Sequence, residues 1–315
     1  IAISRGVSPA TITKNAQTSR VVYEVLRVGP SGRASSIVLS KKDILRHFGI
    51  VPRDLRRVDP SLSLTTTPPA LLVRDKALLL NLGGVRTIVT QDELFIFEPW
   101  RDAGQAFLNN FRDRIETKRS EGESNAEGNT ILGIDGQLTS GHRSEKIKGL
   151  DSSDGRRQSE TGGAVYDFKV DIPFELEAVE AALIVATQNL EEMMISSARR
   201  LSDLMSSMPS QSKVTAERLE ELRRVKQVLL QLDAQAGALR QTMLDLLDDD
   251  EDVRGMVFIE TTSEETKSEM DDAIEEEVEN LIEYYLQRHE TCHSEAERLL
   301  SGARDLEESL SVSLL

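Results

Sequence analysis

Residues 278–310, VENLIEYYLQRHETCHSEAERLLSGARDLEESL, decide the fold of this chain. Ten positions in this stretch recur in steps of four and three, and most carry apolar or small side chains. They are Val278, Ile282, Tyr285, His289, Cys292, Ala296, Leu299, Ala303, Leu306 and Leu310. Such a repeat places one stripe along a helix and is typical of coiled-coil-like packing. Because this heptad stripe is narrow and rich in small residues, we expect it to pack against copies of the same chain rather than in a monomer core.

The helix that carries the heptad stripe is predicted to begin near Ser263, which is a candidate N-cap. Glu264 and Glu265 follow in the first turn, where the helix dipole favours negative charge. No proline interrupts the chain from there to Leu315, so the helix can reach roughly 78 Å at about 1.5 Å per residue. We interpret residues 263–315 as a stalk helix.

Two further helices are predicted before the stalk helix. One follows Pro173, which suits a first-turn position, and continues to Ser207 before Pro209. The other begins near Thr215, and its apolar side chains again recur in steps of three and four. These positions are Leu222, Val225, Leu229, Leu232, Ala236, Leu239, Met243 and Leu246. Residues 164–262 are therefore predicted to form a helical subdomain of long antiparallel helices.

Residues 20–118 are rich in strand signals. A short helix is predicted over 41–48 with Ser40 as its N-cap, and a longer one over 103–118. The apolar or β-branched runs are 21–26, 36–39, 70–73, 77–82, 85–89 and 94–97, separated by turn residues. The sequence thus predicts an α+β fold, with a small mixed or antiparallel sheet and flanking helices before the long helices.

Two segments lack the apolar residues that a packed fold needs. Residues 1–19 are polar, and we expect a flexible N-terminus. Residues 119–163 are dominated by Ser, Gly, Glu, Asn, Asp and Arg, which cannot bury enough surface to offset the entropy of ordering. We predict a disordered insertion there.

The charge of the chain is concentrated at one end. The net charge is −16, and residues 245–315 alone hold 23 acidic and five basic side chains, so the rest of the chain is nearly neutral. This field disfavours nucleic acid as a partner and favours cations. No run of 18 apolar residues occurs, so the sequence contains no membrane span.

Five consecutive acids end the helix that begins near Thr215: Asp248, Asp249, Asp250, Glu251 and Asp252. We call this segment the acidic turn. Carboxylates at a helix C-terminus are disfavoured by up to about 1 kcal/mol each, so they are either solvated or hold a cation. Their oxygen atoms suit Mg²⁺, which takes one or two carboxylates and keeps several waters. The residues alone leave both interpretations open.

Residues 289–293 match the H-E-x-x-H pattern of zinc hydrolases. We disfavour this alternative because His289 already occupies the heptad stripe and no element follows that could supply a third ligand. Gly83 and Gly84 lie between two strand runs and predict a hairpin turn rather than a phosphate loop. The sequence offers no catalytic arrangement, so we expect no enzyme. A coiled-coil structural scaffold without an ion role stays as the other alternative.

Seven segments, in this order, resemble the eukaryotic, mitochondrial-type branch of the CorA magnesium channel superfamily. They are VPRDLRRVD (51–59), ALLVR (70–74), ALLLNL (77–82), VRTIVTQDE (85–93), IPFELEAVEAAL (172–183), LLDDDEDVRGM (246–256) and VENLIEYY (278–285). The family's Gly-Met-Asn pore signature and its two membrane helices are absent from this sequence. The resemblance therefore implies the soluble regulatory domain of a magnesium channel, which senses Mg²⁺ and controls the gate for Mg²⁺ influx.

The resemblance also implies a funnel-shaped homopentamer whose stalk helices lead to a first membrane span beyond Leu315. Its membrane contact would come only through the missing helices. It implies the mitochondrial inner membrane, with this domain on the matrix side, and a plastid or other organelle as the alternative. Regulatory, low-affinity Mg²⁺ would bind between subunits, at Asp249 and Glu251 of the acidic turn and at Glu297. The full set of expected metal-binding residues is Asp248, Asp249, Asp250, Glu251, Asp252, Glu269, Asp272 and Glu297.

Overall fold

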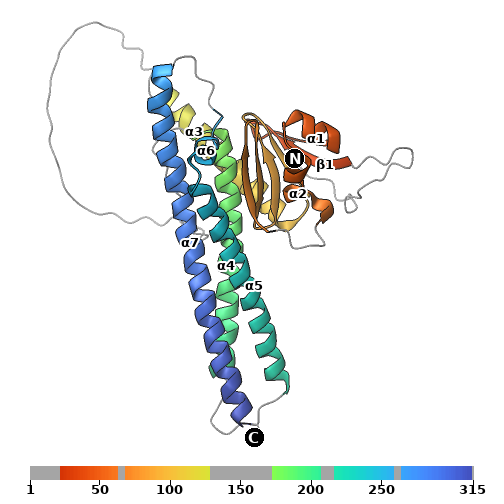
Figure 1. Ribbon diagram of the computed structural model, residues 1–315, viewed down its shortest axis with the longest axis vertical. Coiled ribbons are helices and arrows are strands. Elements are labelled where there is room, and N and C mark those ends of the chain that lie inside the picture. Colours follow the sequence, from red (N-terminus) through yellow and green to blue (C-terminus); the bar gives the residue numbers. More distant parts are fainter. Residues whose placement is uncertain (1–21, 63–67, 128–171, 207–215, 259–263, 314–315) are drawn as a thin grey trace, which may run out of the picture.

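The computed structural model describes residues 22–62, 68–127, 172–206, 216–258 and 264–313. A six-stranded sheet lies beside one end of three long helices (Figure 1). The strands are β1 (Val22–Val28), β2 (Ala34–Ser40), β3 (Ala70–Arg74), β4 (Ala77–Leu82), β5 (Val85–Val89) and β6 (Leu94–Phe97). Their order across the sheet is β2-β1-β6-β5-β4-β3, and each neighbouring pair is antiparallel. The predicted α+β fold is confirmed in its antiparallel form.

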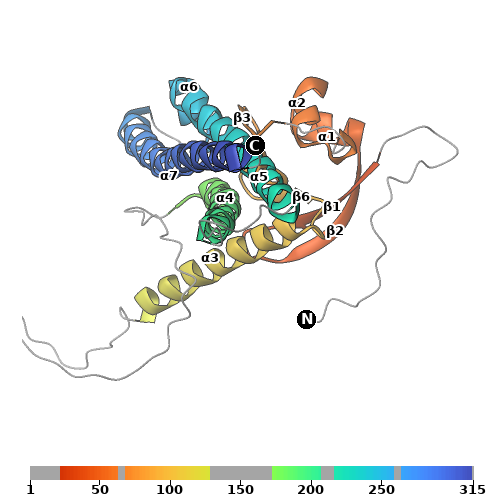
Figure 2. The same cartoon turned by 90° about the horizontal axis from the view of Figure 1, so that it is seen from below.

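Both faces of the sheet are covered, which explains why its strands appear in the sequence as continuous apolar runs. Along β4, Leu78 and Leu80 belong to one buried cluster, and Ala77 and Leu79 belong to another on the opposite face. Helices α1 (Lys41–His47) and α2 (Pro52–Val58) cover the second of these faces. Helices α3 (Asp102–Glu127), α4 (Phe174–Ser206) and α5 (Ala216–Leu247) lie against the first, as Figure 2 shows.

Local signals explain where the elements begin. Ser40 caps α1 through a reciprocal pair of hydrogen bonds with Asp43, as the sequence predicted for this N-cap. Gly83 and Gly84 join β4 to β5 with φ angles of 56° and 90°. A two-residue hairpin with positive φ at both positions favours glycine, so the predicted turn is confirmed. The short helices α2 and α6 (Asp250–Arg254) were not predicted: α2 has no side-chain N-cap of the kind that marks α1, and α6 is only five residues long.

The three long helices α4, α5 and α7 (Glu264–Ser313) pack together along their length (Figures 1 and 2). All eight predicted apolar positions of α5, from Leu222 to Leu246, are buried. The heptad stripe of α7 is buried as well, except that Leu306 is partly buried. The stripe faces α4 and α5 of the same chain, so the expectation that it packs against other copies was wrong. Its small residues instead let α7 approach two helices of its own chain.

Other predictions concern where α3 ends and which segments lack a packed fold. Helix α3 continues to Glu127, beyond the predicted end at Lys118, so the first part of the predicted insertion is helical. Residues 1–19 and 128–163 lie outside the described residues, as does the predicted N-cap Ser263. In the ranges that the structure does describe, no helix is both long enough and apolar enough to cross a bilayer.

Candidate metal centre

The acidic turn is a junction between two helices. Helix α5 ends at Leu247, and Asp249 is the N-cap of α6. The Oδ1 atom of Asp249 accepts hydrogen bonds from the backbone N–H groups of Glu251 (3.0 Å) and Asp252 (3.3 Å). The acids from Asp250 onward therefore lie in a first helical turn, where negative charge is favoured. The expectation that the acidic turn opposes a helix dipole was wrong beyond Asp248, because the chain starts a new helix there.

The inner side of the acidic turn borders a polar hollow next to β3. The hollow is lined by Val73, Arg74, Asp75, Gln91, Glu251, Asp252, Gly255, Val257 and Phe258. Arg74 donates a hydrogen bond from Nε to Asp54 (2.7 Å), so its charge is shared with α2. Burial and the charge of Asp249 raise the pKa of Asp252, although Arg74 opposes this shift. The turn thus carries more negative charge than its surroundings balance.

The outer side of the acidic turn is open to solvent. Asp248, Asp249, Asp250 and Glu251 are exposed. Within the described side chains, the turn does not bring three ligand atoms within 4.8 Å of one another. A cation held at this place would need ligands from water or from another copy of the chain. Glu269 and Asp272 lie on α7, but their side chains are outside the described ones.

The capping role of Asp249 gives the first prediction. Asp249→Ala removes the acceptor for two backbone N–H groups, so we expect the free energy of unfolding to fall by about 1 kcal/mol in urea denaturation. Asp250→Ala is the matched control, because it removes one exposed acid of the same turn without removing the cap. We expect its effect to stay within about 0.5 kcal/mol. A gain in stability from Asp249→Ala would mean that the dipole argument from the sequence was right after all.

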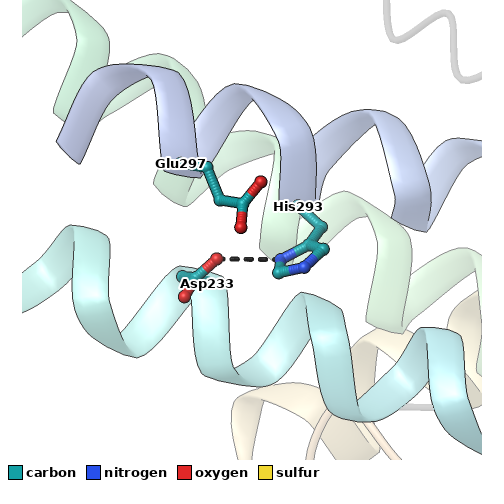
Figure 3. A group of neighbouring side chains, drawn as sticks. All are labelled: Asp233, His293 and Glu297. Atoms are coloured by element: carbon teal, nitrogen blue, oxygen red, sulfur yellow. Dashed lines mark ion pairs between the residues drawn. The ribbon is translucent and has the colours of Figure 1, made fainter. Parts of the chain in front are cut away.

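Three potential metal ligands meet elsewhere, between α5 and α7. Figure 3 shows Asp233 of α5 facing His293 and Glu297, which lie one turn apart on α7. One ligand atom from each residue lies within 4.8 Å of the other two. Asp233 Oδ1 and His293 Nδ1 are 2.8 Å apart, and their side chains are 28% and 30% exposed. Glu297 is exposed, so the centre is open to solvent on one side.

The packing of α5 on α7 explains why these residues meet. The helices run antiparallel, and Arg240 of α5 pairs with Glu290 of α7 at 3.0 Å. Seven residues earlier on α5 and seven later on α7, the same register brings Asp233 opposite Glu297. Gly237, one turn after Asp233, leaves space beside the ring of His293, since an added Cβ would lie 3.6 Å from the nearest ring atom.

The sequence identified only part of this centre. Glu297 belongs to the expected set of metal-binding residues, and the structure places it beside Asp233, which lies 14 residues before the end of α5 at Leu247 and so away from the acidic turn. Asp233 was missed because a single aspartate on an otherwise regular helix gives no local signal. His293 was considered only as a partner of His289. Only the alignment of α5 against α7 could have predicted that these three residues meet.

The structure separates the two histidines of the H-E-x-x-H pattern. His289 is fully buried, and its Nε2 lies 3.0 Å from Thr187 Oγ1 on α4. Burial, together with the charge of Arg288, lowers the pKa of His289 to about 4. His293 instead faces Asp233 on α5. The two rings point to different helices and share no metal position, so the zinc hydrolase alternative loses its ligand pair.

A buried ionic group joins α3, α4 and α7 near the sheet. Arg114 of α3 pairs with Glu177 and Glu180 of α4, which are 4% and 0% exposed. The hydroxyl of Tyr285 on α7 also donates a hydrogen bond to Glu180 (3.3 Å). Burial raises the pKa of Glu180 to about 7, although the charge of Arg114 opposes the shift. Two carboxylates share one guanidinium here, which makes this group sensitive to the loss of Arg114.

The chain is similar to a known protein family and to several curated proteins. The family model described as "Magnesium transporter MRS2-like" matches residues 29–132 and 139–314. The chain is 34% identical over 305 residues to "Magnesium transporter MRS2-11, chloroplastic" of Arabidopsis thaliana, covering 93% of this chain and 56% of that protein. It is 33% identical over 305 residues to "Magnesium transporter MRS2-A, chloroplastic" of Oryza sativa subsp. japonica, covering 93% and 54%. The chain thus spans about half the length of the curated relatives it matches.

Proposed function

The chain belongs to the MRS2-like family of magnesium transporters, within the CorA superfamily, and from this premise we propose that it senses Mg²⁺ and controls the gate of a transporter for Mg²⁺ influx. The observation that carries the proposal is the link between the acidic turn and α7. Arg254, at the end of α6, donates two hydrogen bonds to Glu275 of α7, at 2.8 and 3.1 Å. A cation that neutralises the acidic turn therefore acts on a helix anchored to α7.

The chemistry of the acidic turn supports Mg²⁺ as the ion. Its ligands are carboxylate oxygens, which hard cations prefer, and its open side leaves room for the waters that Mg²⁺ retains. Because one chain does not complete a three-ligand group there, we propose that another copy supplies further oxygens. This arrangement fits regulatory Mg²⁺ between the subunits of a homopentamer, with 263–315 as the stalk helix of each subunit.

The names of the relatives bear on location. Both of the relatives described above are named chloroplastic. We therefore propose a plastid membrane for the complete protein, which was the alternative in the sequence analysis. The first expectation, the mitochondrial inner membrane, gains no support from these two names.

The test of this function is a Mg²⁺-specific gain in stability. An ion that binds only the folded state raises the free energy of unfolding by about 2.7 kcal/mol at a hundred times its dissociation constant. We expect MgCl₂ to raise the melting temperature more than NaCl of equal ionic strength does, because simple screening acts on all charges alike. Asp250→Ala combined with Glu251→Ala should reduce this Mg²⁺-specific shift and leave the cap at Asp249 in place.

The matched control removes two acids elsewhere. Glu220 and Glu221 lie near the start of α5, far along the helix from the acidic turn, and pair only with neighbouring arginines among the described contacts. Replacing both with alanine changes the net charge by the same amount and should preserve the Mg²⁺-specific shift. A shift that is no larger than in NaCl would leave a structural scaffold as the better description. A shift that is equal in both double variants would remove the acidic turn from the proposal.

A further inference from the structure

We propose that Asp233, His293 and Glu297 form a second cation site, within one chain, for a divalent transition-metal ion such as Zn²⁺. This site joins α5 to α7 (Figure 3), and Asp233 lies 14 residues before the end of α5, where the acidic turn follows. It goes beyond Mg²⁺ sensing, and neither proposal depends on the other. The inference stands on the geometry of the three side chains, on the charge pattern along α5 and α7, and on the donor atoms present.

The first support is the spacing of the ligand atoms. Asp233 Oδ1 and His293 Nδ1 lie 2.8 Å apart, at ion-pair distance, and neither of these buried atoms has a hydrogen-bond partner outside the pair. Two ligand atoms at about 2.0–2.1 Å from one tetrahedral ion stand about 3.3 Å apart, so the pair must separate by about 0.5 Å to admit a metal between them. The two atoms can share a proton on the imidazole, and a cation bound between them would satisfy both in place of that proton.

The second support is an interruption in the charge pattern between the helices. Arg240 pairs with Glu290 at one level, and Lys226 pairs with Glu307 at another, so α5 supplies the base and α7 the acid at both. At the level between them, α5 supplies Asp233 opposite Glu297. Two carboxylates facing each other repel. His293 lies beside Asp233 at this level, and a bound cation would supply the positive charge that Arg240 and Lys226 supply at the flanking levels.

The third support is the chemistry of the donor set. Mg²⁺ and Ca²⁺ are bound through oxygen, whereas imidazole nitrogen suits Zn²⁺ and related ions. One nitrogen and two carboxylate oxygens make a three-ligand site that leaves positions for water on its exposed side. The ring of His293 lies beside Gly237, where even an added Cβ would lie at an ordinary contact distance of 3.6 Å from it.

A plain ion pair between Asp233 and a charged His293 is the competing description. It would leave Glu297 without a role and would give no preference among divalent ions. The two descriptions differ in stoichiometry and in selectivity. Isothermal titration with Zn²⁺ and with Mg²⁺, on the full chain stripped of metal and without a histidine tag, separates them. We expect one Zn²⁺ per chain, bound at least tenfold more tightly than Mg²⁺.

Single substitutions test whether the ion binds at these residues. His293→Asn should weaken Zn²⁺ binding at least tenfold, whereas His47→Asn, which removes an exposed histidine on α1, should not change it. Glu297→Gln supplies a second test at an exposed position, where misfolding is not expected, and it should weaken Zn²⁺ several-fold. His293→Asn should retain the Mg²⁺-specific shift assigned to the acidic turn.

Two results would overturn the site. Zn²⁺ binding that is unchanged in both His293→Asn and Glu297→Gln would place the ion elsewhere, and Zn²⁺ affinity no higher than that of Mg²⁺ would remove the role of the imidazole. Failure of the Mg²⁺ proposal would give a different result. The acidic turn would then contribute no Mg²⁺-specific shift in melting temperature, while one Zn²⁺ would still bind per chain.

Discussion

Replacement of Arg114 by methionine is expected to lower the free energy of unfolding by about 3–5 kcal/mol at pH 8. Glu177 and Glu180 share this guanidinium and are almost completely buried. Without it, two carboxylates remain close together in a core where water cannot solvate them. Breaking a buried ionic group by removing one partner is among the most destabilising single changes. Urea denaturation of the variant and the parent chain measures the loss.

Glu180→Gln is the matched control, since it keeps the shape of the side chain and removes its charge. The pKa of Glu180 is raised in the folded state from an ordinary value of 4.5 to about 7. Between these values the folded chain holds a proton that the unfolded chain has lost, so stability falls as the pH rises through this window. The fall is about 3 kcal/mol at most and ends above pH 7.

Glu180→Gln should therefore flatten the stability profile between pH 5 and pH 7 and be at least as stable as the parent at pH 8. Coincident pH profiles for the parent and Glu180→Gln would show that this carboxyl does not hold its proton in the folded state. A loss well below about 1 kcal/mol in Arg114→Met would show that the three charged groups are better solvated than the structure indicates.

Gly83→Ala is expected to cost about 2–5 kcal/mol. The residue has a φ of 56°, which an L side chain adopts at a cost of about 1–2 kcal/mol. An added Cβ would also lie 2.5 Å from the Cα and 2.8 Å from the Cβ of Ala186 on α4. The β4–β5 turn and α4 would therefore have to move apart. Overpacking of this kind adds about 1–3 kcal/mol. Thermal unfolding of the variant measures the sum.

Gly32→Ala separates the two causes. Gly32 has a φ of 71°, but no atom lies within 4 Å of its added Cβ. Its loss should therefore be limited to the backbone cost of about 1–2 kcal/mol. The difference between the two variants measures the close contact between the β4–β5 turn and α4. Equal losses at Gly32 and Gly83 would mean that the turn and α4 adjust without strain.

Local patterns in the sequence were sufficient for most elements. The six strand runs, the N-cap at Ser40 and the buried face of α5 all depend on neighbouring residues, and the structure confirms them. The heptad stripe was identified correctly as a buried surface, but a period shows which face is covered and not what covers it. Its partners α4 and α5 belong to the same chain, and only the tertiary arrangement could reveal this.

The candidate sites were harder to predict for two physical reasons. In the acidic turn, aspartate is equally compatible with a solvated helix end and with an N-cap, so the break after Leu247 left no sequence signal. At the second cation site, Asp233 and Glu297 are brought together by the register of two antiparallel helices. Such a register is set by the packing of the whole interface, and no single residue specifies it.

Because the heptad stripe is buried within its own chain, one chain can fold without contact with another copy. A chain whose α7 is already covered by α4 and α5 has a complete core before it meets another copy. Folding of the single chain is therefore expected not to depend on protein concentration. The exposed sides of the helices carry many charged side chains, and contacts made through those side chains weaken as ionic strength rises. In the homopentamer proposed above, each subunit would therefore keep its fold while the contacts between subunits change with ionic conditions.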